Sequence, residues 1–531
     1  RARFDVTAEG DSGRLAEAVF GLDDASTVVE GSASFRGMLT IDPESKTLQG
    51  TLLVPEGRLA GVPVSDWNGE VFWDRSILSI GYARGRFGSG SARLQLHQPL
   101  PVAEHPASLV VDVEDASLSA ILSGVTGSPS PVDSRISGQG TFSFVAEHPE
   151  KVEGSFELQG VAPEESTDPS RSTPLSFRAQ AAVGDERLSI QELEIEAPFL
   201  SARLSGVYPR EGSASLSIDV ESGSLAAAAA LQRELQRIFP TEENSTPVEW
   251  EIEGSGRVSG QLRERLPRLV FEGDLVAEDL RIDGVPFGGM RMNALISRDS
   301  VTFRDLQARV EEGTLSGRGS FSLLGPLREK DFDLDLALSR WPVADLSAAV
   351  GSPYELGGVL SGSFTASRWR SRLEGSADLE LTEARVNGID LERSEARLRF
   401  EGGRIRLDPL SLGHRGGALV GHVEIDTESR SLQGLVTAEK FSLAAMTPSW
   451  AALTGEAEGE IEILGSLDEP VARLTGRARA TGVRGIELGE ATLAGRVLGK
   501  DLELSVGVKG QTSQLSLESS VRLEGDFLSR G

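Results

Sequence analysis

The chain has 531 residues, a net charge of −28 and no cysteine. The lack of cysteine excludes disulfides, thiolate metal sites and cysteine nucleophiles. With 81 acidic residues against 53 basic ones, no basic stripe is available to neutralise phosphates, so we expect no binding of nucleic acid. No apolar run in the sequence is long enough to span a bilayer.

One sequence pattern occurs five times, at intervals of about one hundred residues. Each copy opens with a short segment rich in leucine and small residues, and the equivalent positions are Leu15, Leu118, Leu225, Val343 and Leu443. The openings predict short helices, the longest over residues 225–239, where apolar positions recur at helical spacing. The copies divide the chain into repeats over residues 1–105, 106–212, 213–330, 331–430 and 431–531. Such a chain forms a continuous array that extends by adding units.

Strand signals follow each opening. In the fourth copy Phe332, Leu334, Leu336 and Leu338 alternate with polar or small residues, and residues 501–508 repeat this alternation. Since neighbouring side chains of a strand point to opposite faces, each strand has one apolar and one polar face. The pairs Asp283-Gly284, Asn387-Gly388 and Gly402-Gly403 predict tight hairpins. We therefore expect a mostly antiparallel sheet with one apolar face.

Candidate chemistry is sparse. The segment from Gly495 to Asp501 departs from a phosphate-binding loop in spacing and is better explained as a hairpin turn. His414 and His422 flank a glycine-rich turn without metal-site spacing, and the alternating Asp331, Asp333 and Asp335 are typical of a solvated strand face. We expect no catalytic residue, no metal site and no cofactor, and therefore no enzyme.

The repeats resemble those of the AsmA-like/TamB family of bacterial envelope proteins. The similarity rests on LGSLDEPVARLTGRARATGV from Leu464, on its continuation to Val497, and on GGALVGHVEI from Gly416. The resemblance implies an all-β fold with a few short helices, in which an elongated repeat sheet is rolled into an open apolar groove, the β-taco of AsmA-like repeats. Because the chain begins at Arg1 within a repeat, we expect it to be a segment of a longer protein.

The resemblance also implies a function and a location. Such a protein carries phospholipid between the inner and outer membranes of a diderm bacterium and contributes to outer-membrane biogenesis. It lies in the periplasm and is anchored in the inner membrane by a region outside this sequence. The expected partners are phospholipid acyl chains and an outer-membrane β-barrel protein. Two alternatives stay open: an assembly or translocation factor for outer-membrane β-barrel proteins or autotransporters, and a structural or adhesive β-solenoid with a filled interior.

The alternating strands identify the residues that we expect to line a lipid groove. They come from one strand and one strand pair in the fourth copy and from one strand in the fifth. The expected lining residues are Phe332, Leu334, Leu336, Leu338, Leu398, Phe400, Ile405, Leu407, Leu502, Leu504, Val506 and Val508.

Overall fold

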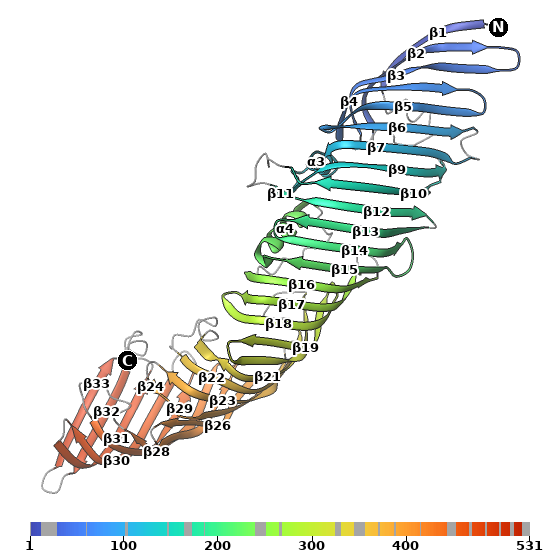
Figure 1. The fold of residues 1–531 in the computed structure, drawn as a ribbon. Helices are drawn as coiled ribbons and strands as arrows, with labels where there is room; N and C mark the ends of the chain where they lie inside the picture. Colours follow the sequence, from blue (N-terminus) through green and yellow to red (C-terminus); the bar gives the residue numbers. More distant parts are fainter. Residues whose placement is uncertain are drawn as a thin grey trace. The chain divides into compact units, whose positions relative to one another are not determined.

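The computed structural model shows an all-β chain with two helices among the residues that it describes (Figure 1). Two compact units are present: unit 1 comprises residues 1–244 and 254–274, and unit 2 comprises residues 245–253 and 275–531. The described residues are 2–11, 29–59, 61–100, 105–145, 148–163, 172–184, 186–238, 251–264, 268–323, 331–344, 356–369, 372–386, 389–414, 416–442, 453–466, 470–483, 486–498, 501–509 and 514–522.

Unit 1 is an antiparallel sheet in which each strand pairs with the previous strand of that sheet, from β1 to β16. Its strands are β1 (Ala2–Asp11), β2 (Val29–Ile41), β3 (Lys46–Leu59), β4 (Val62–Trp73), β5 (Ile77–Phe87), β6 (Gly90–Pro99), β7 (Ala107–Ser117), β9 (Arg135–Val145), β10 (His148–Val161), β12 (Ser176–Gly184), β13 (Arg187–Ala197), β14 (Leu200–Pro209), β15 (Ser215–Ser222) and β16 (Ile252–Arg263). The short strands β8 (Val132–Asp133) and β11 (Thr173–Pro174) pair separately in parallel.

Unit 2 continues the same plan of antiparallel neighbours. Strand β16 and strand β17 (Val270–Ile282) each contain residues of both units. The further strands are β18 (Val285–Ile296), β19 (Ser300–Val310), β20 (Gly313–Ser322), β21 (Phe332–Pro342), β22 (Leu356–Trp369), β23 (Arg372–Val386), β24 (Ile389–Asp390), β25 (Ser394–Glu401), β26 (Arg404–His414), β27 (Gly417–Asp426), β28 (Ser431–Ser442), β29 (Leu453–Gly465), β30 (Pro470–Val483), β31 (Ile486–Leu498), β32 (Asp501–Lys509) and β33 (Gln514–Arg522).

The sheet is open and antiparallel, as the sequence predicts. Two of the predicted hairpins are confirmed. Asp283 and Gly284 have φ values of 50° and 79°, and Gly402 and Gly403 have φ values of 55° and 79°. Two successive left-handed residues make the tight turn whose twist matches that of the flanking strands. The turn residues of the third hairpin, 387–388, lie outside the described residues, although Val386 faces Ile389 across it.

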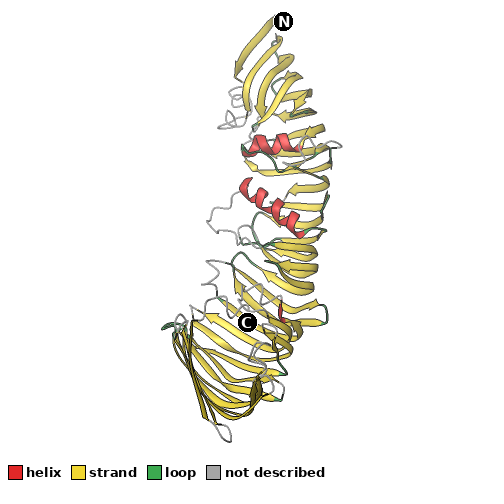
Figure 2. Cartoon of the chain, turned by 90° about the vertical axis from the view of Figure 1, so that its left-hand side faces the viewer, coloured by secondary structure: helices red, strands yellow, loops and turns green. Residues whose placement is uncertain are grey.

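Many strands carry a β-bulge that the alternation of apolar residues does not predict. At several of them a residue with positive φ directly precedes a buried one: Asp115 precedes Ala116, Arg340 precedes Trp341, and the pairing register shifts at both places. A bulge places two residues opposite one, which bends the strand and increases its twist. The repeated bulges therefore bend the strands, and the sheet of unit 2 is visibly curled (Figure 2).

The two helices lie beside the sheet of unit 1 (Figure 2). Helix α3 (Leu118–Thr126) begins after Ser117, whose hydroxyl accepts a hydrogen bond from the Ala120 amide, and it ends at the left-handed Gly127. Helix α4 (Leu225–Ile238) is the longer one, as predicted. Both lie at predicted repeat openings. The first opening and most of the fourth and fifth lie outside the described residues, and the five-repeat division stays a prediction.

No helix within the described ranges combines the length and the apolar character that crossing a bilayer requires.

Candidate functional site

One face of unit 2 is charged and exposed. Arginine and carboxylate side chains on adjacent strands form ion pairs across it, with N–O distances of 3.0 Å for Arg318–Asp335, 2.9 Å for Arg406–Glu424 and 3.4 Å for Arg473–Glu462. Arg397 and Asp378 form another such pair. Exposed ion pairs contribute about 0–1 kcal/mol each to stability. The charged face therefore contributes more to solubility and to the pairing register of the strands than to stability.

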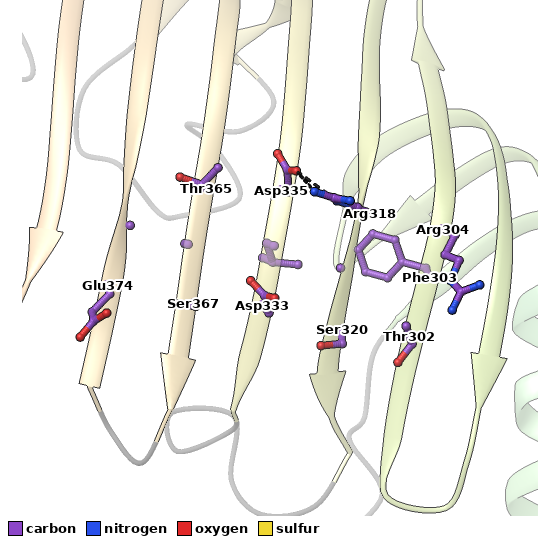
Figure 3. A pocket seen from close by; sticks show the side chains of 14 residues that line it. Thr302, Phe303, Arg304, Arg318, Ser320, Asp333, Asp335, Thr365, Ser367 and Glu374 are labelled. Atoms are coloured by element: carbon purple, nitrogen blue, oxygen red, sulfur yellow. Dashed lines mark hydrogen bonds and ion pairs between the residues drawn. The ribbon is translucent and has the colours of Figure 1, made fainter.

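A shallow hollow of about 670 Å³ lies on strands β19 to β23, lined largely by polar side chains (Figure 3). Its polar lining includes Asp333, Asp335 and Glu374, of which Asp335 accepts two hydrogen bonds from Arg318. Asp333 and Asp335 are exposed, which agrees with a solvated strand face. Among the residues that the structure describes, no group of three or more histidine, aspartate or glutamate side chains is arranged to hold a metal ion.

Hydrogen bonds lower the pKa values of Asp426, in a turn of unit 2, and of Asp219, on the sheet of unit 1. Hydrogen bonds from the backbone amides of Ser429 and Glu428 lower the pKa of Asp426, and the nearby Arg404 lowers it further. A hydrogen bond from Arg257 lowers the pKa of Asp219 in unit 1. Both shifts favour the ionised form and have structural causes, so neither indicates a catalytic acid.

The opposite face of unit 2 is apolar, and strand β21 shows the contrast. Phe332, Leu334, Leu336 and Leu338 are half-buried, whereas the alternating Asp333, Asp335, Ala337 and Ser339 are exposed. The three leucines pack against a buried cluster of Phe303, Leu306, Ala308, Val310, Leu315 and Trp341. The predicted lining residues of this strand therefore share one face.

Strands β25 and β26 place the next four predicted residues on the same face. Leu398 lies opposite Leu407, and Phe400 lies opposite Ile405, so the four form two cross-strand pairs. All four are half-buried, and the alternating Arg397, Arg399 and Arg406 are exposed. The ring of Phe400 also meets Phe364 of β22 edge-on, with centroids 6.3 Å apart. The contacts thus continue from β22 to β26.

In β32, Val506 and Val508 pack in a second cluster with Ala478, Ala491, Ala457 and Leu493. The side chains of Leu502 and Leu504 lie outside the described residues. The backbone register places Leu502 opposite Val497 and Leu504 opposite Gly495. Whether any of the twelve residues contacts lipid stays a prediction.

The pairing register joins these groups into one row. From β21 to β32, successive cross-strand partners are Leu336, Phe364, Ala377, Leu398, Leu407, Val423, Gly434, Ile463, Ala472, Val497 and Leu502. The row contains no polar side chain. A residue on it has apolar neighbours on both adjacent strands, which makes the apolar surface continuous across the sheet.

This face is also the more enclosed of the two, although no second sheet covers it among the described residues. Alanine gives a comparison at constant side-chain size. Ala377, Ala478 and Ala491 on the apolar face are 2%, 1% and 5% exposed, whereas Ala337 and Ala494 on the charged face are exposed. Neighbouring apolar side chains therefore cover the alanines of the apolar face, whereas these two alanines of the charged face are open to solvent. The half-buried leucines between them keep part of their surface accessible.

Two residues of this face are absent from the sequence-based prediction. Trp341, near the end of β21, is 2% exposed. Arg368 occupies a position in the apolar register of β22, opposite Phe332 and Leu373. The alternation Leu360, Gly362, Phe364, Ala366 could have identified Arg368, had the strand been extended beyond Ser367.

Comparison of the sequence with protein-family models and with curated proteins gives no match.

Proposed function

We propose that the chain carries phospholipid acyl chains along its apolar face, as its resemblance to the AsmA-like/TamB repeats implies. The observation that carries the proposal is the unbroken apolar row from Leu336 to Leu502. The periplasmic location, the anchor in the inner membrane and the passage of lipid toward the outer membrane are parts of the same proposal.

The physical basis is the cost of exposing hydrocarbon to water. Each CH₂ group of an acyl chain gains about 0.8 kcal/mol on leaving water for apolar surroundings. A lipid with two tails therefore crosses an aqueous gap very slowly unless a protein covers the tails. A row of similar aliphatic side chains offers a path with small changes in free energy, and the open sheet lets the headgroup stay in water.

Photo-crosslinking at adjacent residues tests which face holds lipid. A photoreactive amino acid replaces Leu407 in one variant and Arg406 in the other, two positions on opposite faces of β26. After incubation with phosphatidylglycerol vesicles, lipid adducts are counted by mass spectrometry. We expect at least tenfold more adduct at Leu407. Equal labelling at the two positions contradicts the proposal.

A charge on the apolar face tests transport. Leu493→Asp and Ala494→Asp introduce the same group at neighbouring positions of β31, the first half-buried on the apolar face and the second exposed on the charged face. A lipid that moves along the apolar face must pass every strand, so one hydrated carboxylate on that face blocks its passage. Only Leu493→Asp should therefore stop lipid transfer between vesicles. It should also fail to restore the outer-membrane barrier of a deletion strain.

The same pair of variants distinguishes the alternatives. A strand-assembly factor works through backbone edges, which neither substitution changes, so both variants should stay active. In a solenoid with a filled interior, Leu493→Asp buries an unpaired charge and should unfold the protein. Folding of Leu493→Asp is therefore measured by circular dichroism alongside transfer.

A further inference from the structure

Arg368 differs from the other arginines of unit 2 in its surroundings. Arg318, Arg397 and Arg406 lie on the charged face and form ion pairs with carboxylates of adjacent strands. Arg368 lies in the apolar register of β22, between Phe332 of β21 and Leu373 of β23. It is the only arginine, lysine, aspartate or glutamate in the apolar register at the described paired positions from β18 to β33.

The guanidinium of Arg368 is partly buried and has no partner among the described side chains. Its Nε atom is buried without a hydrogen-bond acceptor. No described side chain forms an ion pair or hydrogen bond with it, and its terminal nitrogens are not among the buried unpaired atoms, so they reach the surface. Asp333 and Glu374, which follow its cross-strand partners Phe332 and Leu373, belong to the opposite face. Partial burial of a cation at this position costs free energy unless an anion accepts hydrogen bonds from it.

The position within the sheet indicates what kind of anion fits. Arg368 is the penultimate residue of β22, and Phe332 is the first residue of β21, so the arginine lies at the margin where the apolar face ends. The exposed Arg372 begins β23 and lies opposite Trp369, the residue after Arg368. Arg368 and Arg372 therefore lie close together at this margin, the first in the apolar register and the second on the charged face. An amphiphile with apolar tails on the face would place its polar end at such a margin.

We infer that Arg368 binds the phosphate of a phospholipid headgroup while the acyl chains contact the apolar face beside Phe332. This inference rests on the proposed function and adds a headgroup contact to it. The planar guanidinium can donate to two phosphate oxygens at once, and its partial burial strengthens each charge-assisted hydrogen bond. A single contact at the edge of the apolar face favours lipids that carry phosphate and still lets them dissociate.

The test compares two lipids that share acyl chains. Binding of fluorescent phosphatidylglycerol and of the corresponding diacylglycerol, which lacks phosphate, is measured with the intact protein and with Arg368→Gln. We expect the intact protein to prefer phosphatidylglycerol about tenfold, and Arg368→Gln to lose this preference while binding diacylglycerol normally. Arg372→Gln, at the exposed start of β23, is the matched control and should keep most of the preference.

The outcomes separate the inference from the function on which it rests. If neither lipid binds the intact protein, the proposed function fails. If both bind equally well, or if Arg368→Gln keeps the preference, acyl chains still bind but the headgroup contact is overturned. Glycerol phosphate, which has no tails, serves as a competitor at the same concentration. Its failure to displace phosphatidylglycerol supports a headgroup site, and full displacement shows a site for free phosphate instead.

Discussion

Two patches of the same apolar face in unit 2 are packed in different ways. The filled patch, on β18 to β21, joins Phe303, Leu306 and Trp341 with half-buried Phe287, Met290 and Phe321. The shallow patch, on β29 to β32, consists of Ala478, Ala491 and Val508 with Ala457, Leu493 and Val506. Both follow the same alternation along the strands. Side-chain size therefore decides where the face forms a core and where it leaves room above the strands.

The difference suggests a division of roles within one sheet. Aromatic and long aliphatic side chains cover one another in the filled patch, where the rings of Phe287 and Trp341 lie 6.3 Å apart. Burial of such side chains contributes most of the stability available to a single-layered sheet. Alanine and valine cover little surface, so under the proposed function we expect an acyl chain to lie on the shallow patch more readily than on the filled patch.

The largest expected effect comes from emptying the filled patch. Trp341→Ala removes a side chain that is 2% exposed and should destabilise unit 2 by about 3–5 kcal/mol. Ala491→Gly in the shallow patch should cost about 1 kcal/mol or less. Hydrogen exchange of the β20, β21 and β31 amides measures both effects locally, because long repeat arrays depart from two-state unfolding. Similar losses at the two sites would contradict the comparison.

A smaller effect is expected from adding a methyl group to a glycine in each patch. A Cβ at Gly319 would lie 2.7 Å from the Asp333 backbone oxygen, 2.7 Å from the Leu334 side chain and 2.8 Å from the Phe303 ring. A Cβ at Gly476 would meet only backbone, at 2.9 Å from the Glu458 oxygen. Gly319→Ala should therefore cost about 1–3 kcal/mol by overpacking, and Gly476→Ala less. Chemical denaturation measures both variants, and an equal cost would show that backbone contacts dominate.

The sequence predicts the two faces well and their packing poorly. Alternation is a local property, so residues 332–338 and 398–407 could be assigned to one face without knowledge of their neighbours. The bulge at Arg340 depends on how β21 pairs with β22, and it turns Trp341 into the filled patch. Neither the difference between the two patches nor the unpaired state of Arg368 follows from one strand alone. Both depend on cross-strand partners that only the register defines.

The bulges themselves provide the next prediction. Ala480, next to the shallow patch, is exposed and has a φ of 50°, a conformation that costs alanine more than glycine. Ala480→Gly should therefore stabilise unit 2 by about 0.5–1 kcal/mol after the entropic cost of glycine is included. Ala494→Gly, at an exposed strand position without positive φ, is the control and should destabilise. Thermal melting of the pair checks the opposite signs, and a loss in both variants would mean that the bulge is not strained.

The smallest effect concerns acid and the turn between β27 and β28, which lies between the two patches along the chain. Asp426 accepts hydrogen bonds from the amides of Glu428 at 3.0 Å and Ser429 at 2.8 Å, and these bonds lower its pKa in the folded state. A carboxylate with a lowered folded pKa contributes stability above the pKa of the unfolded chain, and this stability is lost as pH falls through the folded pKa. Asp426→Asn keeps an acceptor for the turn but cannot titrate.

Denaturation of the intact protein and of Asp426→Asn is compared at pH 7 and at successively lower values beneath pH 4. The intact protein should be slightly more stable at pH 7, and the difference should shrink as the carboxylate becomes protonated. The cost of Trp341→Ala should stay constant over the same range, because no titratable group belongs to the filled patch. If acid weakened the Trp341 variant and the intact protein by different amounts, the charged face and the apolar packing would be coupled through the sheet. The stability of the filled patch would then depend on the charged side chains of the opposite face as well as on side-chain size.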